Sequence, residues 1–358
     1  MQVRDLIEKP AKWLDGSGGE SEIVLSSRVR IARNLEKRRF AHNAPAEELA
    51  SILSATHSAA ASTEAFSDGA YFDMGDMSTL DRQFLAERHL VSREFLFNST
   101  SRGLMLKPTE ELCLMINEED HVRIQAFASG LQLRDAYQIA SRLDDELSVQ
   151  MEFAFSERFG YLTACPTNIG TGLRASVLIH LPGLVHTKEI QKLLDSLRQL
   201  HHAIRGLYGE GTEVMGNFFQ LSNSAALGTA ESAIIDNLRE MVIRLTGFER
   251  KAREMLLRKA RSLLEDKVWR AYGLLRYSRS VSSKEALSLI SAVRLGVGVG
   301  LLEPLPMRTL NQLLIYIQPA HLQLLEGRSM EPQERDEARA NLIRKTLSES
   351  IGDQEADS

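Results

Sequence analysis

The pattern of hydrophobic and polar positions changes near residue 229. Before that point, short apolar runs alternate with segments of helical periodicity. The apolar runs predict strands at residues 22–25, 112–116, 122–127, 175–181 and 214–221, and the periodic segments predict helices at 46–62, 80–90, 136–147 and 190–204, the last ended by Gly206. Two of the strands are separated only by the polar residues 117–121, so we expect them to be antiparallel neighbours. Residues 20–220 therefore read as one α+β domain.

From Thr229 onward the pattern is almost wholly helical. Helix formers fill the segments near 229–278, 283–295, 307–326 and 332–349. Ser282 with Glu285 resembles a capping box, the pattern that starts a helix. We expect a first domain over residues 1–235, an all-helical domain over 236–350, and a frayed acidic tail over 351–358.

Composition excludes several classes of protein. A chain of 358 residues that is 43% hydrophobic and 25% charged is typical of a soluble protein of two ordinary domains. A net charge of -5 does not favour nucleic-acid binding, and no apolar run predicts a secretory leader or a membrane span. The two cysteines, Cys113 and Cys165, form no CxxC pair, which argues against a zinc finger or a disulfide scaffold. We expect a cytoplasmic protein.

Arginines stand in positions that suit phosphate binding. Arg28 and Arg30 alternate with apolar residues, so on a strand they would point from one face. Arg123, Arg174 and Arg205 sit beside other apolar strands or glycine turns. A guanidinium group offers planar, bidentate donors to phosphate oxygens. For any one of these arginines alone, an ordinary surface ion pair is the favoured interpretation.

Acidic residues and a cysteine occupy two shaped loops. Glu118, Glu119 and Asp120 lie between two apolar strands, where like charges raise one another's pKa and can make a base; a solvated turn is the alternative. Cys165 stands in a loop rich in proline and glycine, near Thr167, which could donate a hydrogen bond to a thiolate. A small core residue is the alternative for the cysteine.

Five segments occur in a characteristic order between residues 26 and 228. They read SSRVRIARN, NEEDHVRIQ, ACPTNIGTGLRASV, RGLYGEGTE and QLSNSAALG. Together they resemble the phosphagen (guanidino) kinase family. The resemblance implies a catalytic domain with an antiparallel sheet flanked by helices, and phosphoryl transfer from ATP. It also implies Mg²⁺ held through the nucleotide phosphates, with no dedicated metal cage in the protein.

The resemblance assigns roles to residues within these segments. It implies that the phosphates are held by Arg28, Arg30, Arg123, Arg174 and Arg205. It implies that His89 contacts the base of the nucleotide. The rest of the nucleotide site would be lined by Ser26, Ser27, Val29, Ala175, Ser176, Val177, Leu178, Gly206, Leu207, Tyr208 and Gly209. Glu119 would be the catalytic carboxylate, supported by Glu118, while Cys165 and Glu210 would contact the substrate guanidinium. A guanidinium is protonated at neutral pH, so it must be oriented and lose a proton as it attacks.

Departures from the small-molecule members indicate a branch of the family. Those enzymes carry a helical domain before the first segment, whereas 25 residues precede Ser26 here. Their chains also lack the helical region after residue 230. Both features resemble the bacterial protein-arginine kinases, whose phosphoarginine-binding RDxxRA motif is matched by Arg335, Asp336, Arg339 and Ala340. On a helix the two arginines would share a face, and a solvated, salt-bridged face is the alternative.

We therefore expect an ATP-dependent kinase that phosphorylates arginine residues of target proteins and marks them for regulated proteolysis or inactivation. The resemblance implies protein substrates with accessible arginines, such as a stress-response repressor. It implies two further partners, a zinc-binding activator protein and Clp-type chaperone–protease machinery. It also implies allosteric control and a homodimer. It implies no nucleic acid and no membrane. Two other hypotheses stay open: a small-molecule guanidino kinase of unusual architecture, and a phosphoarginine-reading adaptor with weak activity.

Overall fold

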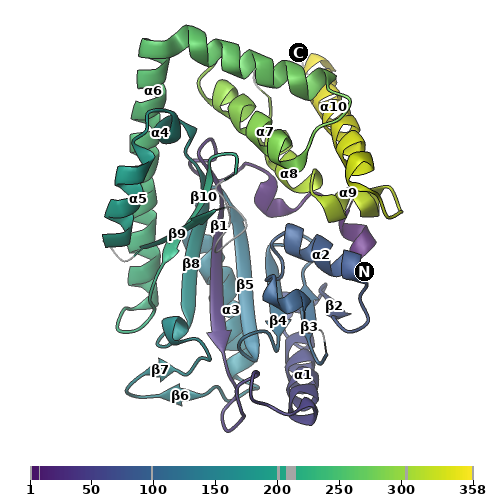
Figure 1. Ribbon diagram of the computed structural model, residues 1–358. Helices are drawn as coiled ribbons and strands as arrows, with labels where there is room; N and C mark the ends of the chain where they lie inside the picture. Colours follow the sequence, from purple (N-terminus) through teal and green to yellow (C-terminus); the bar gives the residue numbers. More distant parts are fainter. Residues whose placement is uncertain are drawn as a thin grey trace.

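The computed structural model describes residues 2–7, 9–97, 100–199, 202–206, 215–302 and 305–356. Within these ranges an antiparallel sheet of eight strands has the order β2-β3-β4-β5-β1-β8-β10-β9 (Figure 1). Its strands are β1 (Val24–Arg33), β2 (Ala70–Asp73), β3 (Gly103–Leu106), β4 (Leu112–Ile116), β5 (Val122–Ser129), β8 (Leu173–His180), β9 (His202–Gly206) and β10 (Phe218–Asn223). A separate hairpin pairs β6 (Phe155–Ser156) with β7 (Gly160–Tyr161). The expected α+β catalytic fold is confirmed.

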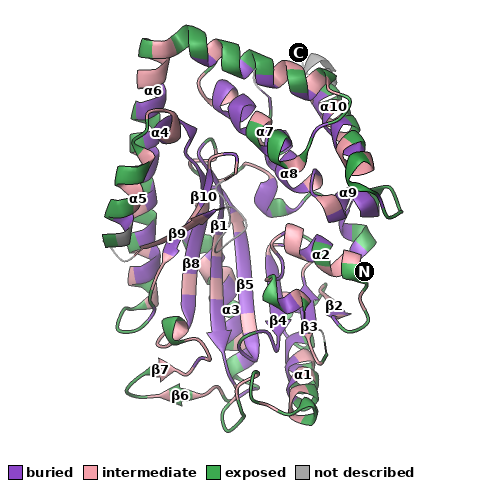
Figure 2. Cartoon of the chain, in the orientation of Figure 1, coloured by how far each residue is buried: buried purple, intermediate pink, exposed green. Residues whose placement is uncertain are grey.

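Helices cover one face of this sheet. They are α1 (Ala46–Ala61), α3 (Leu133–Ser148), α4 (Pro182–His186) and α5 (Ile190–Gln199), whereas α2 (Thr79–Glu87) packs on the opposite face beside Cys113 and Met115. Helix α3 turns Ala136, Ala140 and Leu147 toward the sheet, at the spacing that keeps one helical stripe apolar. These side chains join Val29 and Ile31 of β1 in the main hydrophobic core. Figure 2 shows how completely the central strands are buried.

The predicted helix at 190–204 is confirmed over 190–199 and is wrong at 202–204, which belong to a strand. Helix α5 ends at Gln199, and Ile204 lies in β9 opposite Leu221 of β10. Ile204 happens to continue the helical spacing of the preceding leucines. Its backbone groups are hydrogen-bonded to β10 instead. Strand pairing of this kind overrides a helical spacing of apolar residues in the local sequence.

The C-terminal region is all-helical, as predicted. It contains α6 (Glu231–Tyr277), α7 (Ser283–Gly298), α8 (Met307–Tyr316), α9 (Pro319–Leu325) and α10 (Pro332–Ala356). The Ser282 hydroxyl accepts a hydrogen bond from the Glu285 amide at 3.3 Å, so the predicted N-cap of α7 is present. The single helix predicted over 307–326 is two helices, because Pro319 lacks the amide that would continue α8 and instead begins α9.

Helix α6 passes from one hydrophobic core to another. Ile234 and Leu245 belong to the core of the sheet, whereas Leu264 and Val268 belong to the core of the helical region. Between them the backbone leaves helical geometry at Ala260, with φ -143° and ψ 33°. We therefore propose that the boundary between the domains lies near Ala260 rather than at the expected residue 235.

A third core joins the N-terminal segment to both domains. Its short 3₁₀ helices η1 (Val3–Leu6) and η2 (Lys12–Leu14) bury Leu6 and Trp13 against α2 and the sheet on one side. On the other side the same core includes Ile315 and Leu324 of the helical region. Figure 1 shows this purple segment between the sheet and the C-terminal helices. The start of the chain thus fills the junction between the two domains.

Glu87, the last residue of α2, ties the catalytic domain to α9. Its carboxylate accepts hydrogen bonds from the Ala320 amide at 2.9 and 3.0 Å and from the His321 amide at 3.0 Å. Burial raises the pKa of Glu87 from 4.5 to about 7, although these amides and the charges of Arg339 and Arg335 lower it. The junction therefore contains a carboxyl group that titrates near neutrality.

We predict that Glu87→Gln changes the pH dependence of stability. A folded-state pKa above the unfolded value of 4.5 means that the contribution of protonated Glu87 is complete below that value and is lost as pH rises through about 7. Relative to the variant, the free energy of unfolding of the native protein should fall between about pH 5 and pH 8. Denaturant titrations at several pH values measure this difference. Parallel profiles for the two proteins would contradict it, and Glu240→Gln, at an exposed position of α6, is the matched control.

Candidate active site

One face of the sheet collects the arginines predicted to hold phosphates. In the antiparallel register Arg28 lies opposite Phe127 and Ser176, and Arg30 lies opposite Gln125 and Arg174. Side chains directly opposite one another project from the same face. The same registers place Arg123 opposite Ala32 of β1 and Arg205 opposite Gln220 of β10. All five predicted arginines therefore lie on one face, spread over β5, β1, β8 and β9.

Four residues expected at the nucleotide site point the other way. The side chains of Val29, Ala175 and Val177 belong to the main core on the opposite face. The Ser27 hydroxyl donates to the Gly130 carbonyl at 2.8 Å and accepts from the Gln132 amide at 2.9 Å. A strand alternates its faces, so neighbours of the arginines support the binding face from behind. The expectation is corrected accordingly, although Val177 also borders the pocket described next.

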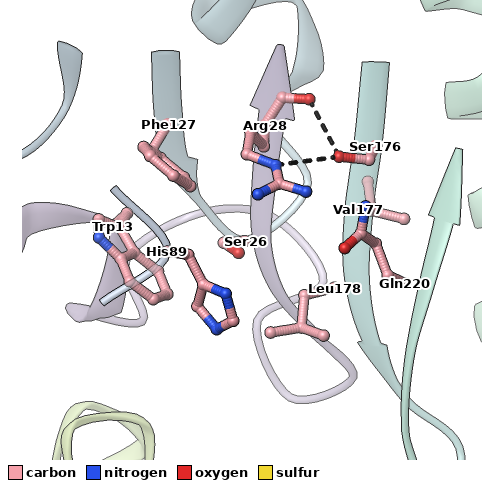
Figure 3. Close-up of a pocket in the computed structure, with 9 residues that line it drawn as sticks. All are labelled: Trp13, Ser26, Arg28, His89, Phe127, Ser176, Val177, Leu178 and Gln220. Carbon is pink, nitrogen blue, oxygen red and sulfur yellow. Dashed lines mark hydrogen bonds between the residues drawn. The ribbon is translucent and has the colours of Figure 1, made fainter. Parts of the chain in front are cut away.

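A pocket opens beside Arg28 at the start of β1 (Figure 3). Of the predicted nucleotide-site residues it is lined by Ser26, Arg28, His89, Ser176, Val177 and Leu178; it is also lined by Trp13, Phe127 and Gln220. Phe127 and Gln220 share the strand periodicity of the arginines, so alternation alone could have found them. The sequence carries no comparable signal for Trp13, because packing of distant segments brings it here.

Crowding of like charges defines the electrostatics of this face. Burial first, and then the charges of Arg123 and Arg174, lower the pKa of Arg28 to about 9. Burial, followed by the charge of Arg28, holds the pKa of Arg30 well below its usual value. Arg28 donates to the Ser176 hydroxyl at 3.4 Å, and Arg174 donates to the Ser222 hydroxyl at 3.2 Å. These two partners are neutral hydroxyls, and Arg123 is paired with Glu118, so several cations remain crowded on this face. A polyanion such as a triphosphate would relieve the repulsion among these arginines and raise their pKa values toward the usual value.

His89 contributes an uncharged ring to the pocket. It follows α2 with a left-handed backbone, φ 59°, and its carbonyl accepts from the Gln125 amide group at 3.0 Å. Burial, followed by the charges of Arg28 and Arg93, lowers the pKa of His89 to about 3. The imidazole is therefore neutral at physiological pH and adds no charge beside Arg28.

The acidic turn between β4 and β5 carries two carboxylates with different environments. Glu118 is buried, pairs with Arg123 and accepts a hydrogen bond from Ser92. Burial alone would raise the pKa of Glu118, but Arg123 and these hydrogen bonds lower it to about 2. Glu119 opens to solvent, and its partial burial with the negative charges of Asp120 and Glu118 raises its pKa. Glu118 is thus fixed as an anion, while Glu119 is the better proton acceptor.

Cys165 lies beside Glu119. The thiol lowers the pKa of Glu119 against the burial and negative charges that raise it, and the Cys165 Sγ atom lies 3.1 Å from the Thr167 hydroxyl. The loop can pack this closely because Gly170, at φ 112°, runs against Ala226. A Cβ atom at Gly170 would come within 2.6 Å of the Ala226 carbonyl oxygen. The structure therefore brings together the carboxylate and thiol that were predicted separately.

Asp120 fastens these two loops to each other. Its buried carboxylate accepts from the Asn34 side-chain amide at 2.6 Å and from the Ala164 backbone amide at 2.7 Å. The Asn34 carbonyl oxygen in turn accepts from the His121 amide at 3.0 Å. One carboxylate thus joins the end of β1, the acidic turn and the residue before Cys165. Sequence patterns named Asp120 only as one member of an acidic cluster.

Family comparisons now bear on this geometry. The model for "ATP:guanido phosphotransferase, C-terminal catalytic domain" matches residues 51–252, and that for "Protein-arginine kinase McsB C-terminal domain" matches residues 261–357. A protein-arginine kinase from Desulforamulus reducens is 43% identical over 97% of this chain and 98% of its own length. One from Symbiobacterium thermophilum is 45% identical over 94% and 97%. The chain belongs to the protein-arginine kinases of the ATP:guanido phosphotransferase family.

Solved structures confirm the fold expected of this family. Lombricine kinase superposes with a TM-score of 0.57 at 24% identity, over 68% of this chain and 71% of its own. The duplicated taurocyamine kinase of Schistosoma mansoni, solved with transition-state-analogue components, gives a TM-score of 0.59 at 27% identity. That match covers 75% of this chain and 39% of the other. This guanido phosphotransferase therefore shares the phosphagen-kinase architecture.

The predicted phosphoarginine motif lies on α10, where its members have unequal access. Arg339 is 1% exposed; it donates to the Ile317 carbonyl at 2.8 Å and to the Val281 carbonyl at 2.9 Å, and it pairs with Asp336. Ala340 is buried, and Arg335 is half-buried. Arg339 therefore holds the helical domain together, which leaves Arg335 as the more accessible cation of the motif.

Four of the predicted site residues lie outside the part of the chain that the structure describes. Leu207, Tyr208, Gly209 and Glu210 lie outside the described residues, whereas Gly206 ends β9. Among the residues that the structure describes, no group of three or more His, Cys, Asp or Glu side chains is arranged to hold a metal ion. Within those same ranges, no helix is long and apolar enough to cross a membrane.

We predict that Asp120→Asn reduces turnover without weakening nucleotide binding. The variant keeps the size of the side chain but loses the charge that holds Ala164 and Asn34, so Cys165 and Glu119 should lose their mutual alignment. Displacement on the scale of 1 Å can lower kcat by about 100-fold. Steady-state kinetics, calorimetry with MgADP and the rate of Cys165 alkylation measure the three effects. An unchanged kcat would contradict the prediction, and Asp145→Asn at an exposed position of α3 is the control.

Proposed function

We propose that this protein transfers the γ-phosphoryl group of Mg-ATP to an arginine guanidino nitrogen in other proteins. The observation that carries the proposal is the order of groups along β1. The pocket lies at Ser26, Arg28 and Arg30 follow on the same face, and the acidic turn with Cys165 lies beyond the other end of the strand. A nucleotide lying along this face would direct its terminal phosphate toward Glu119 and Cys165.

The residues at that end fit attack by a guanidinium. The Nη–P bond forms as the bond from the γ-phosphorus to the ADP oxygen breaks, and the nitrogen gives up a proton. Glu119 accepts that proton, while anionic Glu118 keeps Arg123 in place and Cys165 orients the acceptor. The arginine face stabilises the charge on the transferring group. Mg²⁺ would be bound through the nucleotide phosphates and would neutralise part of their charge.

Residues outside this geometry complete the proposal. Glu210 is proposed as a second carboxylate against the acceptor guanidinium, on the resemblance of its segment alone. A protein acceptor, rather than a free guanidino compound, is supported by the names of the close relatives and by the match of the helical region. The small-molecule alternative would be favoured if free arginine were phosphorylated faster than a protein.

We further propose the biological setting that the family resemblance implies. The protein acts in the cytoplasm, is controlled allosterically through the α10 motif, and marks proteins such as a stress-response repressor for regulated proteolysis by Clp-type machinery. A zinc-binding protein activates it. It forms a homodimer through its helical region, a proposal supported by exposed apolar side chains on α6: Leu263 is 77% exposed, Trp269 52% and Tyr277 70%.

We predict that Glu119→Gln removes most phosphoryl transfer and leaves nucleotide binding largely intact. Glutamine preserves the shape but cannot accept the guanidinium proton, and loss of a positioned base lowers rates by about 100- to 10,000-fold. The assay incubates the protein with Mg-ATP and an arginine-rich protein, followed by mass spectrometry under conditions that preserve phosphoramidates. Near-normal turnover would refute the assignment. Glu240→Gln, on the exposed side of α6, is the control.

We predict that Arg335→Ala weakens phosphoarginine binding and any stimulation of activity by phosphoarginine. Arg335 is the better test because Arg339→Ala would leave the buried carbonyls of Ile317 and Val281 without their donor and destabilise the helical region. Calorimetry with free phosphoarginine measures the affinity. Equal affinity in Arg335→Ala and the native protein would remove the motif from consideration, and the exposed Arg328→Ala serves as control.

A further inference from the structure

The pocket has an aromatic wall, and one ring of that wall comes from outside the sheet and outside both matched family regions. Trp13 lies in η2 and is 2% exposed. Its ring stacks on Phe127 with centroids 5.4 Å apart and planes inclined by 22°. It meets His89 edge-on, at 6.2 Å and 67°. Three rings from three different segments thus make one continuous surface (Figure 3).

The rest of the pocket complements this aromatic surface. Leu178 adds an apolar contact, while Gln220 and the neutral His89 bring groups able to hydrogen-bond the edge of a planar ring. The Arg28 guanidinium lies 5.9 Å from the centre of the Phe127 ring. The cavity therefore passes from an aromatic, uncharged end to the start of the arginine face, which is the sequence of base and phosphates in a nucleotide.

Three contacts fix Trp13 in place before any ligand binds. The Lys12 amide donates to the Thr109 carbonyl at 3.1 Å, and the Asn311 side chain donates to the Leu14 carbonyl at 3.2 Å. Upstream, Arg88 donates to the Lys9 carbonyl at 3.3 Å. The backbone around Trp13 is held from the β3–β4 turn, from the residue after α2 and from α8, so a ligand meets a preformed wall.

We propose that Trp13 contacts the purine base of the bound nucleotide and sets the preference of this site for a nucleotide over a bare phosphate chain. The assignment rests on the proposed function, since it needs the arginine face to bind the phosphates. It gives the N-terminal segment a role in substrate binding.

The variant Trp13→Leu tests binding of the base independently of binding of the phosphates. Calorimetry with MgADP and with inorganic tripolyphosphate is the measurement, because tripolyphosphate carries the charges without the base. The Kd for MgADP should rise by about tenfold or more, as expected for loss of base stacking, while the Kd for tripolyphosphate stays unchanged. Trp13→Phe should retain most of the affinity, and Phe248→Leu, which is 50% exposed on α6, should retain all of it. Equal loss for both ligands, or loss for neither, would overturn the assignment.

A second measurement does not depend on the folding of Trp13→Leu. The chain has two tryptophans, so Trp269→Phe leaves Trp13 as the single emitter. Its fluorescence should change saturably with MgADP, with the Kd that calorimetry gives, and should not change with tripolyphosphate. Binding of MgADP without any change in emission would overturn the role of Trp13. Failure of the native protein to bind either ligand would instead overturn the proposed function, and with it this assignment.

Discussion

Repulsion among the arginines on one face of β1 is the constraint on which the rest of the structure depends. Buried like charges destabilise a fold unless the backbone that carries them is held by something else. That support is the opposite face, where Val29 and Ile31 alternate with Arg28 and Arg30 and pack against α3. The same strand period therefore creates both the binding face and the core that makes it possible.

The two carboxylates of the acidic turn show how environment separates their roles. They are adjacent in sequence, yet Arg123 and Ser92 stabilise the charge on Glu118, whereas Asp120 and Glu118 disfavour charge on Glu119. Environments that shift two neighbouring pKa values in opposite directions are typical of an assigned acid or base. Asp120 takes a third role, because both of its partners are amides that position neighbouring segments.

Sequence patterns predicted what depends on local period and missed what depends on distant packing. Strand alternation placed Arg28 and Arg30 on one face, and the turn at Glu118 was read from its two apolar flanks. The same alternation, applied strictly, would have excluded the side chains of Val29 and Ala175 from the nucleotide site. Trp13 and the buried state of Arg339 could not be read this way, because their partners lie far away in the chain. Ile204 shows the converse error, since a helical spacing was overruled by pairing with β10.

Three consecutive residues at the end of α2 connect the parts of the molecule. Glu87 binds the first amides of α9, Arg88 pairs with Glu110 and holds the N-terminal segment, and His89 lines the pocket. The contact to α9, the contact to the N-terminal segment and the pocket wall therefore share one short stretch of backbone. Trp13 is subject to the same coupling, because Asn311 of α8 holds the carbonyl of Leu14. The helical domain therefore contacts two of the segments that line the pocket.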